Sequence, residues 1–204
     1  MSAAARLDAA LEGRYRIERE LGEGSPDGAW FVHRTSSNEP GAGDILAGRP
    51  EGEAAPVPLV ATAFTELSPA ISPNGRWMAY SSNETGRFEI FVVPFPNAGE
   101  AKWPLSVGGG TEPSWSRDGH EVFYRNGQGD MVAVRVEIEP VFSVGPTSVL
   151  FSAAAYPAAA VHHQYDVSPD GERFLMIRPK SSATPGQLIL VQNFFEELRA
   201  RVPD

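Results

Sequence analysis

The segment Ser72-Pro73-Asn74-Gly75-Arg76-Trp77-Met78-Ala79-Tyr80 recurs in modified form three more times in this chain of 204 residues. The related copies begin at Ser25, Ser116 and Ser168, so that successive copies start 47, 44 and 52 residues apart. Each copy contains an Asp-Gly or Asn-Gly pair, which tolerates positive φ and closes tight hairpins. A repeat of about 40–50 residues has the length of one four-stranded propeller blade. The pattern therefore predicts an all-β protein built from β-propeller-type repeats.

The expected fold has about four blades between short N- and C-terminal helices. We place the blades near residues 25–64, 65–108, 109–151 and 161–193. The strand-like runs expected within them are residues 30–32, 44–47, 57–60, 77–81, 89–93, 102–105, 122–124, 131–136, 149–151, 174–177 and 188–191. Short apolar approaches precede three of the turns, at residues 69–71, 113–115 and 165–167. A capping-box pattern begins the helix expected at 194–204. Four repeats make either a small ring or a partial propeller, and a partial propeller has unpaired strand edges that favour self-association.

The composition excludes several functional classes. The 17 basic and 26 acidic residues give a formal net charge of −9, which argues against a nucleic-acid partner because phosphate binding needs clustered Lys and Arg. The absence of cysteine excludes disulfides, thiolate metal sites and cysteine nucleophiles. The first residues lack the apolar core of a secretory signal, and no run reaches the about 18 apolar residues of a membrane span. As written, the chain is expected to be cytoplasmic.

Residues 1–24 are expected to form a short helix and a strand. The portion Gly13-Arg14-Tyr15-Arg16-Ile17-Glu18-Arg19-Glu20-Leu21-Gly22-Glu23-Gly24 resembles the opening of bacterial serine/threonine protein kinases, where such a strand leads into the glycine-rich loop over the nucleotide phosphates. After Gly24 the chain departs from that family, because the third glycine, the catalytic lysine and the His-Arg-Asp and Asp-Phe-Gly motifs do not follow. We therefore expect no phosphoryl transfer, no cofactor and no enzymatic activity.

The repeats resemble WD-like and TolB-like propeller repeats, and more closely the propeller at the C-terminus of bacterial membrane-anchored serine/threonine kinases. The resemblance covers residues 25–198 and is most specific at 165–176 (YDVSPDGERFLM) and 188–198 (LILVQNFFEEL). In that family the kinase is cytoplasmic, a membrane span follows it, and the propeller is an extracytoplasmic sensing or interaction module. The resemblance implies that the two ends of this chain correspond to the two ends of a larger kinase, joined between Gly24 and Ser25.

Three groups of residues have the composition of a binding site, and we expect a structural role for each. His162 and His163 with Asp166 could form a metal site, but adjacent strand residues point to opposite faces. The run Gly108-Gly109-Gly110 lacks the helix and lysine of a phosphate-binding loop and is expected to link blades. The turn carboxylates could coordinate calcium, but we expect them to stabilise their own turns by accepting backbone hydrogen bonds. These carboxylates are Asp27, Asp118 and Asp170.

Two further groups are weighed in the same way. Trp30, Trp77 and Trp115 are expected to pack between blades rather than to stack on a ligand. Asn83-Glu84-Thr85 fits the glycosylation sequon and lies in an expected turn. We therefore predict no catalytic, cofactor-binding or metal-binding residue.

The sequence predicts a non-catalytic propeller module that recognises a protein, peptide or glycan ligand. Propellers usually bind at the mouth of the central channel, where residues 36–43 and 83–86 are the candidate contributors, by analogy of fold alone. Two alternatives stay open: a serine/threonine kinase family product that has lost phosphoryl transfer, and a TolB-like periplasmic binding component. A phosphorylation assay with ATP separates the first from our interpretation, and cell fractionation separates the second.

Overall fold

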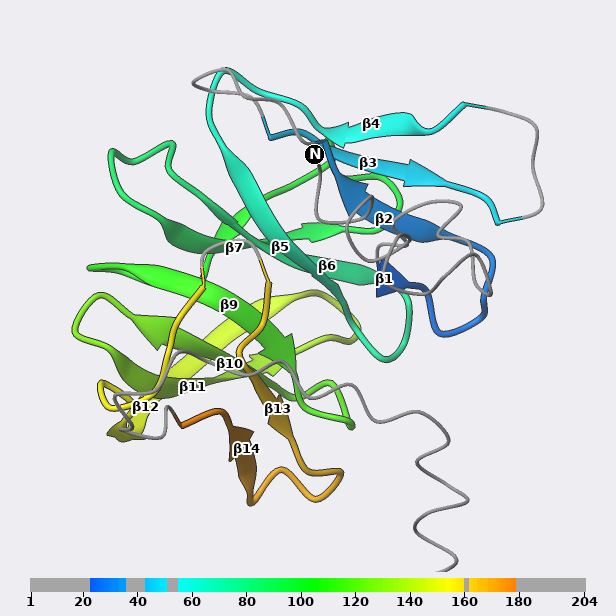
Figure 1. The fold of residues 1–204 in the computed structure, drawn as a ribbon. Helices are drawn as coiled ribbons and strands as arrows, with labels where there is room; N and C mark the ends of the chain where they lie inside the picture. Colours follow the sequence, from blue (N-terminus) through cyan, green and yellow to red (C-terminus); the bar gives the residue numbers. More distant parts are fainter. Residues whose placement is uncertain (1–22, 36–42, 51–54, 160–161, 179–204) are drawn as a thin grey trace, which may run out of the picture.

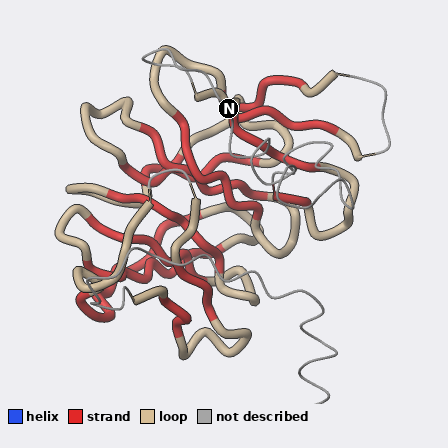
Figure 2. Tube along the Cα trace, in the orientation of Figure 1, coloured by secondary structure: helices blue, strands red, loops and turns tan. Residues whose placement is uncertain are grey.

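A computed structural model describes residues 23–35, 43–50, 55–159 and 162–178. Within these ranges the chain forms fourteen strands and no helix (Figure 2). The expected terminal helices and the expected strand at 188–191 lie outside the described residues. The described part also contains no helix long and apolar enough to cross a membrane.

Four antiparallel sheets follow one another along the chain, and strands that are consecutive in sequence are neighbours in each sheet (Figure 1). The first sheet contains β1 (Glu23–Gly24), β2 (Phe31–Arg34), β3 (Ile45–Gly48) and β4 (Val57–Val60). The second contains β5 (Glu66–Ile71), β6 (Trp77–Ser82), β7 (Glu89–Pro94) and β8 (Trp103–Pro104). The third contains β9 (Gly110–Trp115), β10 (Glu121–Asn126), β11 (Asp130–Glu137) and β12 (Ser143–Ser152). The fourth contains β13 (Tyr165–Val167) and β14 (Phe174–Met176). The all-β prediction is therefore confirmed.

The repeated turn joins the first two strands of every sheet and has the same hydrogen bonds each time. In the second sheet the Ser72 hydroxyl accepts a bond from the N–H of Trp77 (3.0 Å) and donates to Asn74 Oδ1 (2.8 Å). Asn74 Oδ1 also accepts the N–H of Arg76 (3.1 Å), and Gly75 has a φ of +70°. Equivalent bonds form in the turns that begin at Ser25, Ser116 and Ser168. The chemistry that identified the repeat is the chemistry that closes these turns.

Each sheet packs face to face on the next through a buried apolar cluster, as blades do in a propeller. The period of two along a strand divides the side chains between the two faces. On β10, Val122 and Tyr124 belong to the cluster shared with the second sheet, whereas Phe123 belongs to the cluster shared with the fourth.

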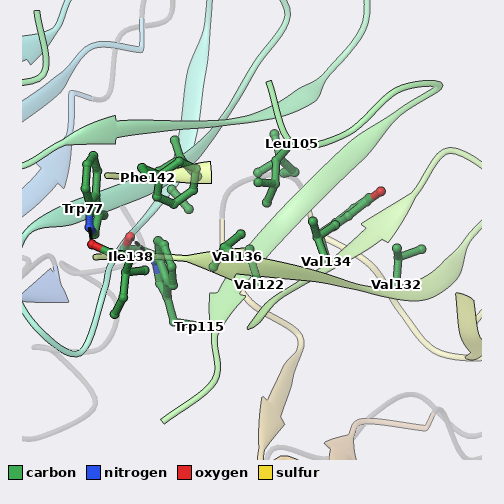
Figure 3. Packing of buried hydrophobic residues seen from close by; sticks show 14 residues of the cluster. Trp77, Leu105, Trp115, Val122, Val132, Val134, Val136, Ile138 and Phe142 are labelled. Atoms are coloured by element: carbon green, nitrogen blue, oxygen red, sulfur yellow. Dashed lines mark hydrogen bonds between the residues drawn. The ribbon is translucent and has the colours of Figure 1, made fainter. Parts of the chain in front are cut away.

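The expectation for the tryptophans is confirmed by these clusters. Trp77 and Trp115 lie between the second and third sheets (Figure 3). Trp115 Nε1 donates to the carbonyl of Ala70 at 3.0 Å, and Trp77 Nε1 donates to that of Ile138 at 3.3 Å. Trp30 packs against the cluster between the first and second sheets. All three side chains are therefore used in packing between sheets.

Candidate functional site

The first strands of the sheets converge, because β5 contacts both β1 and β9. Between β5, β9 and β13, near the repeated turns, lies a cavity of about 330 Å³, which we call the channel pocket. Its lining comes from three consecutive sheets and comprises Ala70, Ile71, Pro73, Ser114, Trp115, Ser116, Arg117, His163, Tyr165 and Asp166. The pocket thus has an apolar wall from the inner strands and polar side chains from the turn and the linker.

Arg117 is the exposed cation of this pocket. It sits in the third repeated turn, which closes as the others do: the Ser116 hydroxyl donates to Asp118 Oδ1 at 2.6 Å, and the N–H of Gly119 reaches the Ser116 carbonyl at 3.0 Å. The Arg117 side chain has no hydrogen bond or ion pair with the described part of the chain. Its charge is therefore not used to hold the turn.

His163 and Asp166 line the pocket but have local partners. His163 Nε2 lies 2.5 Å from the carbonyl oxygen of Pro113, and a carbonyl can only accept, so this nitrogen carries the proton. Asp166 is exposed, and its Oδ1 accepts the N–H of Val167 at 2.8 Å. Across the described ranges no group of three His, Cys, Asp or Glu residues is placed to hold a metal ion. His163 therefore uses Nε2 within the fold, and the expectation of a structural role for the pair formed by His162 and His163 stays a prediction.

A buried ion pair fixes the linker that brings His163 to the pocket. Glu112 is fully buried on β9 and adopts a φ of +57°. Its Oε1 accepts the N–H of Ala159 at 2.6 Å, and its Oε2 accepts that of Gln164 at 3.2 Å. Arg125 Nε lies 3.6 Å from Oε2, while Arg125 Nη1 donates to the carbonyl of Ala153 at 3.3 Å and to that of Tyr156 at 3.2 Å. Together these bonds attach residues 153–159 and 162–164 to the third sheet.

Tyr165 adds a further bond at the same place. Its hydroxyl donates to the Glu112 carbonyl at 2.7 Å and lies 3.2 Å from that of Phe123. Burial, followed by the negative charge of Glu112, raises the pKa of Tyr165 well above its usual value. The sequence offered no signal for this cluster, because Tyr165 lies 53 residues after Glu112 and 42 after Phe123 and the members share no motif.

The glycine run at 108–110 lies near the opposite end of the second sheet. The N–H groups of Gly108 and Gly109 both donate to Glu89 Oε1 at 2.9 Å, and the Ser106 hydroxyl donates to Glu89 Oε2 at 2.5 Å. The two glycines have φ values of +91° and +117°. Successive backbone N–H groups of this kind form a nest for an anion. Here the anion is the protein's own carboxylate, which agrees with the structural interpretation of this run.

The other sequence-based candidates are also engaged in local structure. Hydrogen bonds from the neighbouring serine hydroxyl, followed by backbone N–H groups, lower the pKa values of Asp27, Asp118 and Asp170, as expected for carboxylates that stabilise their own turns. Asn83 of the sequon accepts the N–H of Thr65 through Oδ1 at 2.9 Å. Residues 83–86 join β6 to β7 and do not line the channel pocket. Residues 36–42 lie outside the described part of the chain.

Comparison with known proteins identifies the fold. No protein-family model and no curated protein matches the chain. Among solved structures, a putative TolB from Agrobacterium tumefaciens is 17% identical with a TM-score of 0.52, and the match covers 79% of this chain and 60% of that one. TolB from Acinetobacter baumannii is 14% identical with a TM-score of 0.43, covering 76% and 48% of the two chains. The β-propeller domain of the Trilobed protease from Pyrococcus furiosus is 12% identical with a TM-score of 0.37, covering 69% and 59%. The first of these matches, together with the four antiparallel sheets, shows that the chain has a TolB-like β-propeller fold. The chain spans less than two thirds of each of these structures.

Proposed function

We propose that this chain is a non-catalytic β-propeller module that binds a protein, peptide or glycan ligand in the channel pocket. The observation that carries the proposal is the convergence of three inner strands on one open cavity that contains an uncommitted cation, Arg117, and an exposed carboxylate, Asp166. A pocket of about 300–1,000 Å³ with an apolar wall and a few polar groups is the usual form of a ligand site.

The bonding of Glu89, Glu112 and His163 supports a binding role over catalysis. The buried carboxylates of Glu89 and Glu112 are occupied by N–H groups and hydroxyls of the fold, and His163 is bound to a backbone carbonyl. A general acid or base must reach a substrate atom with its free oxygen or nitrogen. These groups hold loops and linkers, so they support the proposal of a module that recognises rather than transforms its ligand.

We place the chain, within this proposal, among relatives of the sensing propellers of bacterial serine/threonine kinases. That origin is supported by the kinase-like sequence of residues 13–24 and by the repeats of residues 25–198. A catalytically silent kinase family product is the second candidate function. Incubation of the purified chain with radiolabelled ATP, magnesium and a generic protein substrate separates the two, since phosphate transfer contradicts the non-catalytic proposal.

The binding proposal is tested with a phage-displayed library of random dodecapeptides on the immobilised chain. Ser114 lies half-buried in the pocket lining, so that Ser114→Phe fills the pocket while leaving its rim unchanged. We expect enriched peptides that lose binding to Ser114→Phe but keep it for Thr85→Phe, a matched change in an exposed turn residue far from the pocket. No enrichment from peptide or glycan libraries, or equal binding to both variants, refutes the proposal.

A further inference from the structure

The third repeated turn differs from the other three at one position. The residue after the first serine is Pro26, Pro73 and Pro169 in three copies and Arg117 in the remaining one. Proline suits this position because its fixed φ of about −65° is the one required at the entry to the turn. Two repeated turns border the channel pocket, the second through Pro73 and the third through Arg117, and only the third has lost the favourable proline.

Two of these prolines lie beside the glycine of the following turn. Pro26 Cδ lies 3.7 Å from the position of a Cβ on Gly75, and Pro73 Cδ lies 3.6 Å from the same position on Gly119. No atom lies within 4 Å of that position on Gly171, the glycine that follows Arg117 in the series. Arg117 thus makes neither the turn contact of its equivalents nor an ion pair with the described residues. Its guanidinium is available to a ligand.

The surroundings of Arg117 restrict what that ligand can be. Ala70, Ile71 and Trp115 give the pocket an apolar wall, which suits a ligand group with a hydrocarbon stem. A guanidinium binds planar carboxylates and phosphates in a bidentate manner. Asp166 lines the same pocket, and its charge disfavours a dianionic phosphate more than a singly charged carboxylate.

We propose that the channel pocket binds a carboxylate group of a partner polypeptide, with Arg117 as the residue that contacts it. The proposal rests on the proposed binding function and specifies the ligand chemistry of the same site. The carboxylate is that of an acidic side chain or of a C-terminus, and the test distinguishes these two sources.

The decisive variant is Arg117→Pro, which installs the residue of the other three repeats. Because the hydrogen bonds of the turn do not use the arginine side chain, we expect the urea midpoint to stay the same or to rise. Arg87→Ala is the matched control, since it removes an exposed positive charge at the end of the second sheet that lies away from the channel pocket. Asp166→Asn removes the competing negative charge of the pocket and should strengthen binding.

Three peptides serve as probes, and their binding is measured by saturation-transfer difference NMR titration. The first, acetyl-Gly-Leu-Glu-Leu-Gly-amide, carries a side-chain carboxylate only. The second replaces Glu by Gln and has no carboxylate, and the third is the Gln peptide with a free C-terminal carboxylate in place of the amide. We expect at least one carboxylate peptide to bind the unaltered chain and Arg87→Ala equally, and to bind Arg117→Pro at least tenfold more weakly. The Gln amide should not bind. Failure of both carboxylate peptides to bind, equal binding to Arg117→Pro, or equal binding of the Gln amide overturns the proposal. If library peptides without carboxylates occupy the pocket, the binding function stands and this inference alone is wrong.

Discussion

Breaking the buried ion pair between Glu112 and Arg125 should strongly destabilise the protein. Arg125→Met removes the cation but keeps the length of the side chain, and it leaves the fully buried Glu112 carboxylate with only two N–H partners. It also removes the donor to the carbonyls of Ala153 and Tyr156. Leaving one member of a buried pair uncompensated costs about 3–5 kcal/mol. For a chain of this size that corresponds to a fall in Tm of roughly 6–20 °C.

A double-mutant cycle with Glu112→Gln isolates the pair. The glutamine keeps one carbonyl oxygen for an N–H group but carries no charge, so the variant with both changes no longer has an unpaired buried ion. We expect the free energy of unfolding lost in the double variant to be about 1–3 kcal/mol smaller than the sum of the losses in the two single variants. Urea unfolding followed through tryptophan fluorescence measures these losses. Losses below about 1 kcal/mol for Arg125→Met, or additive effects within about 0.5 kcal/mol, refute the account of the linker attachment.

Three further predictions follow from the same bonds. Glu89→Ala removes the carboxylate that the N–H groups of Gly108 and Gly109 bind, so the variant should have a lower thermal midpoint. Acetate supplies a carboxylate to the same N–H groups and should restore part of the midpoint, whereas chloride of equal ionic strength should not. Glu66 is fully buried, and its Oε2 has no hydrogen-bond partner among the residues that the structure describes. Burial raises the pKa of Glu66 above the usual 4.5, so the folded state holds the proton more tightly and stability falls as pH rises from 4.5 through the raised pKa. Glu66→Gln should flatten that fall in unfolding measured from pH 4 to 8. Gly28→Ala adds a Cβ with nothing within 4 Å, so it should lower the free energy of unfolding only by the about 1–2 kcal/mol that a left-handed backbone costs a residue with a Cβ. Gly109→Ala places its Cβ 2.7 Å from the Cα of Gly127 and should lower the free energy of unfolding clearly more. Equal losses of the two variants in urea unfolding would contradict this.

Local chemistry made much of the fold predictable. The Asp-Gly and Asn-Gly pairs require positive φ, so they marked all four repeated turns, and the strand expected at 77–81 is β6 (Trp77–Ser82). The edge strand β12 (Ser143–Ser152) was expected only at its end, because Gly145-Pro146 normally interrupts a strand. Proline is tolerated at the edge of a sheet, where a missing N–H breaks no ladder bond.

The channel pocket was less predictable, because its important contacts are long-range. Nothing in the sequence near Glu112 indicates that it binds the backbone of Ala159 and Gln164, about 50 residues later. The glycine run at 108–110 shows the same limit, since its partner Glu89 comes from another strand. Arg117 did carry a local signal, the loss of a repeated proline, but its meaning depends on the position of the turn beside the pocket.

The central claim is that ligand binding takes place in the channel pocket, and hydrogen–deuterium exchange with a library-selected peptide tests it most directly. The account predicts slowed exchange confined to segments 69–73, 113–117 and 163–166, which come from three sheets and line one cavity. Protection centred instead on residues 83–91 and 104–108, at the other end of the second sheet, would place the binding site elsewhere and contradict the account.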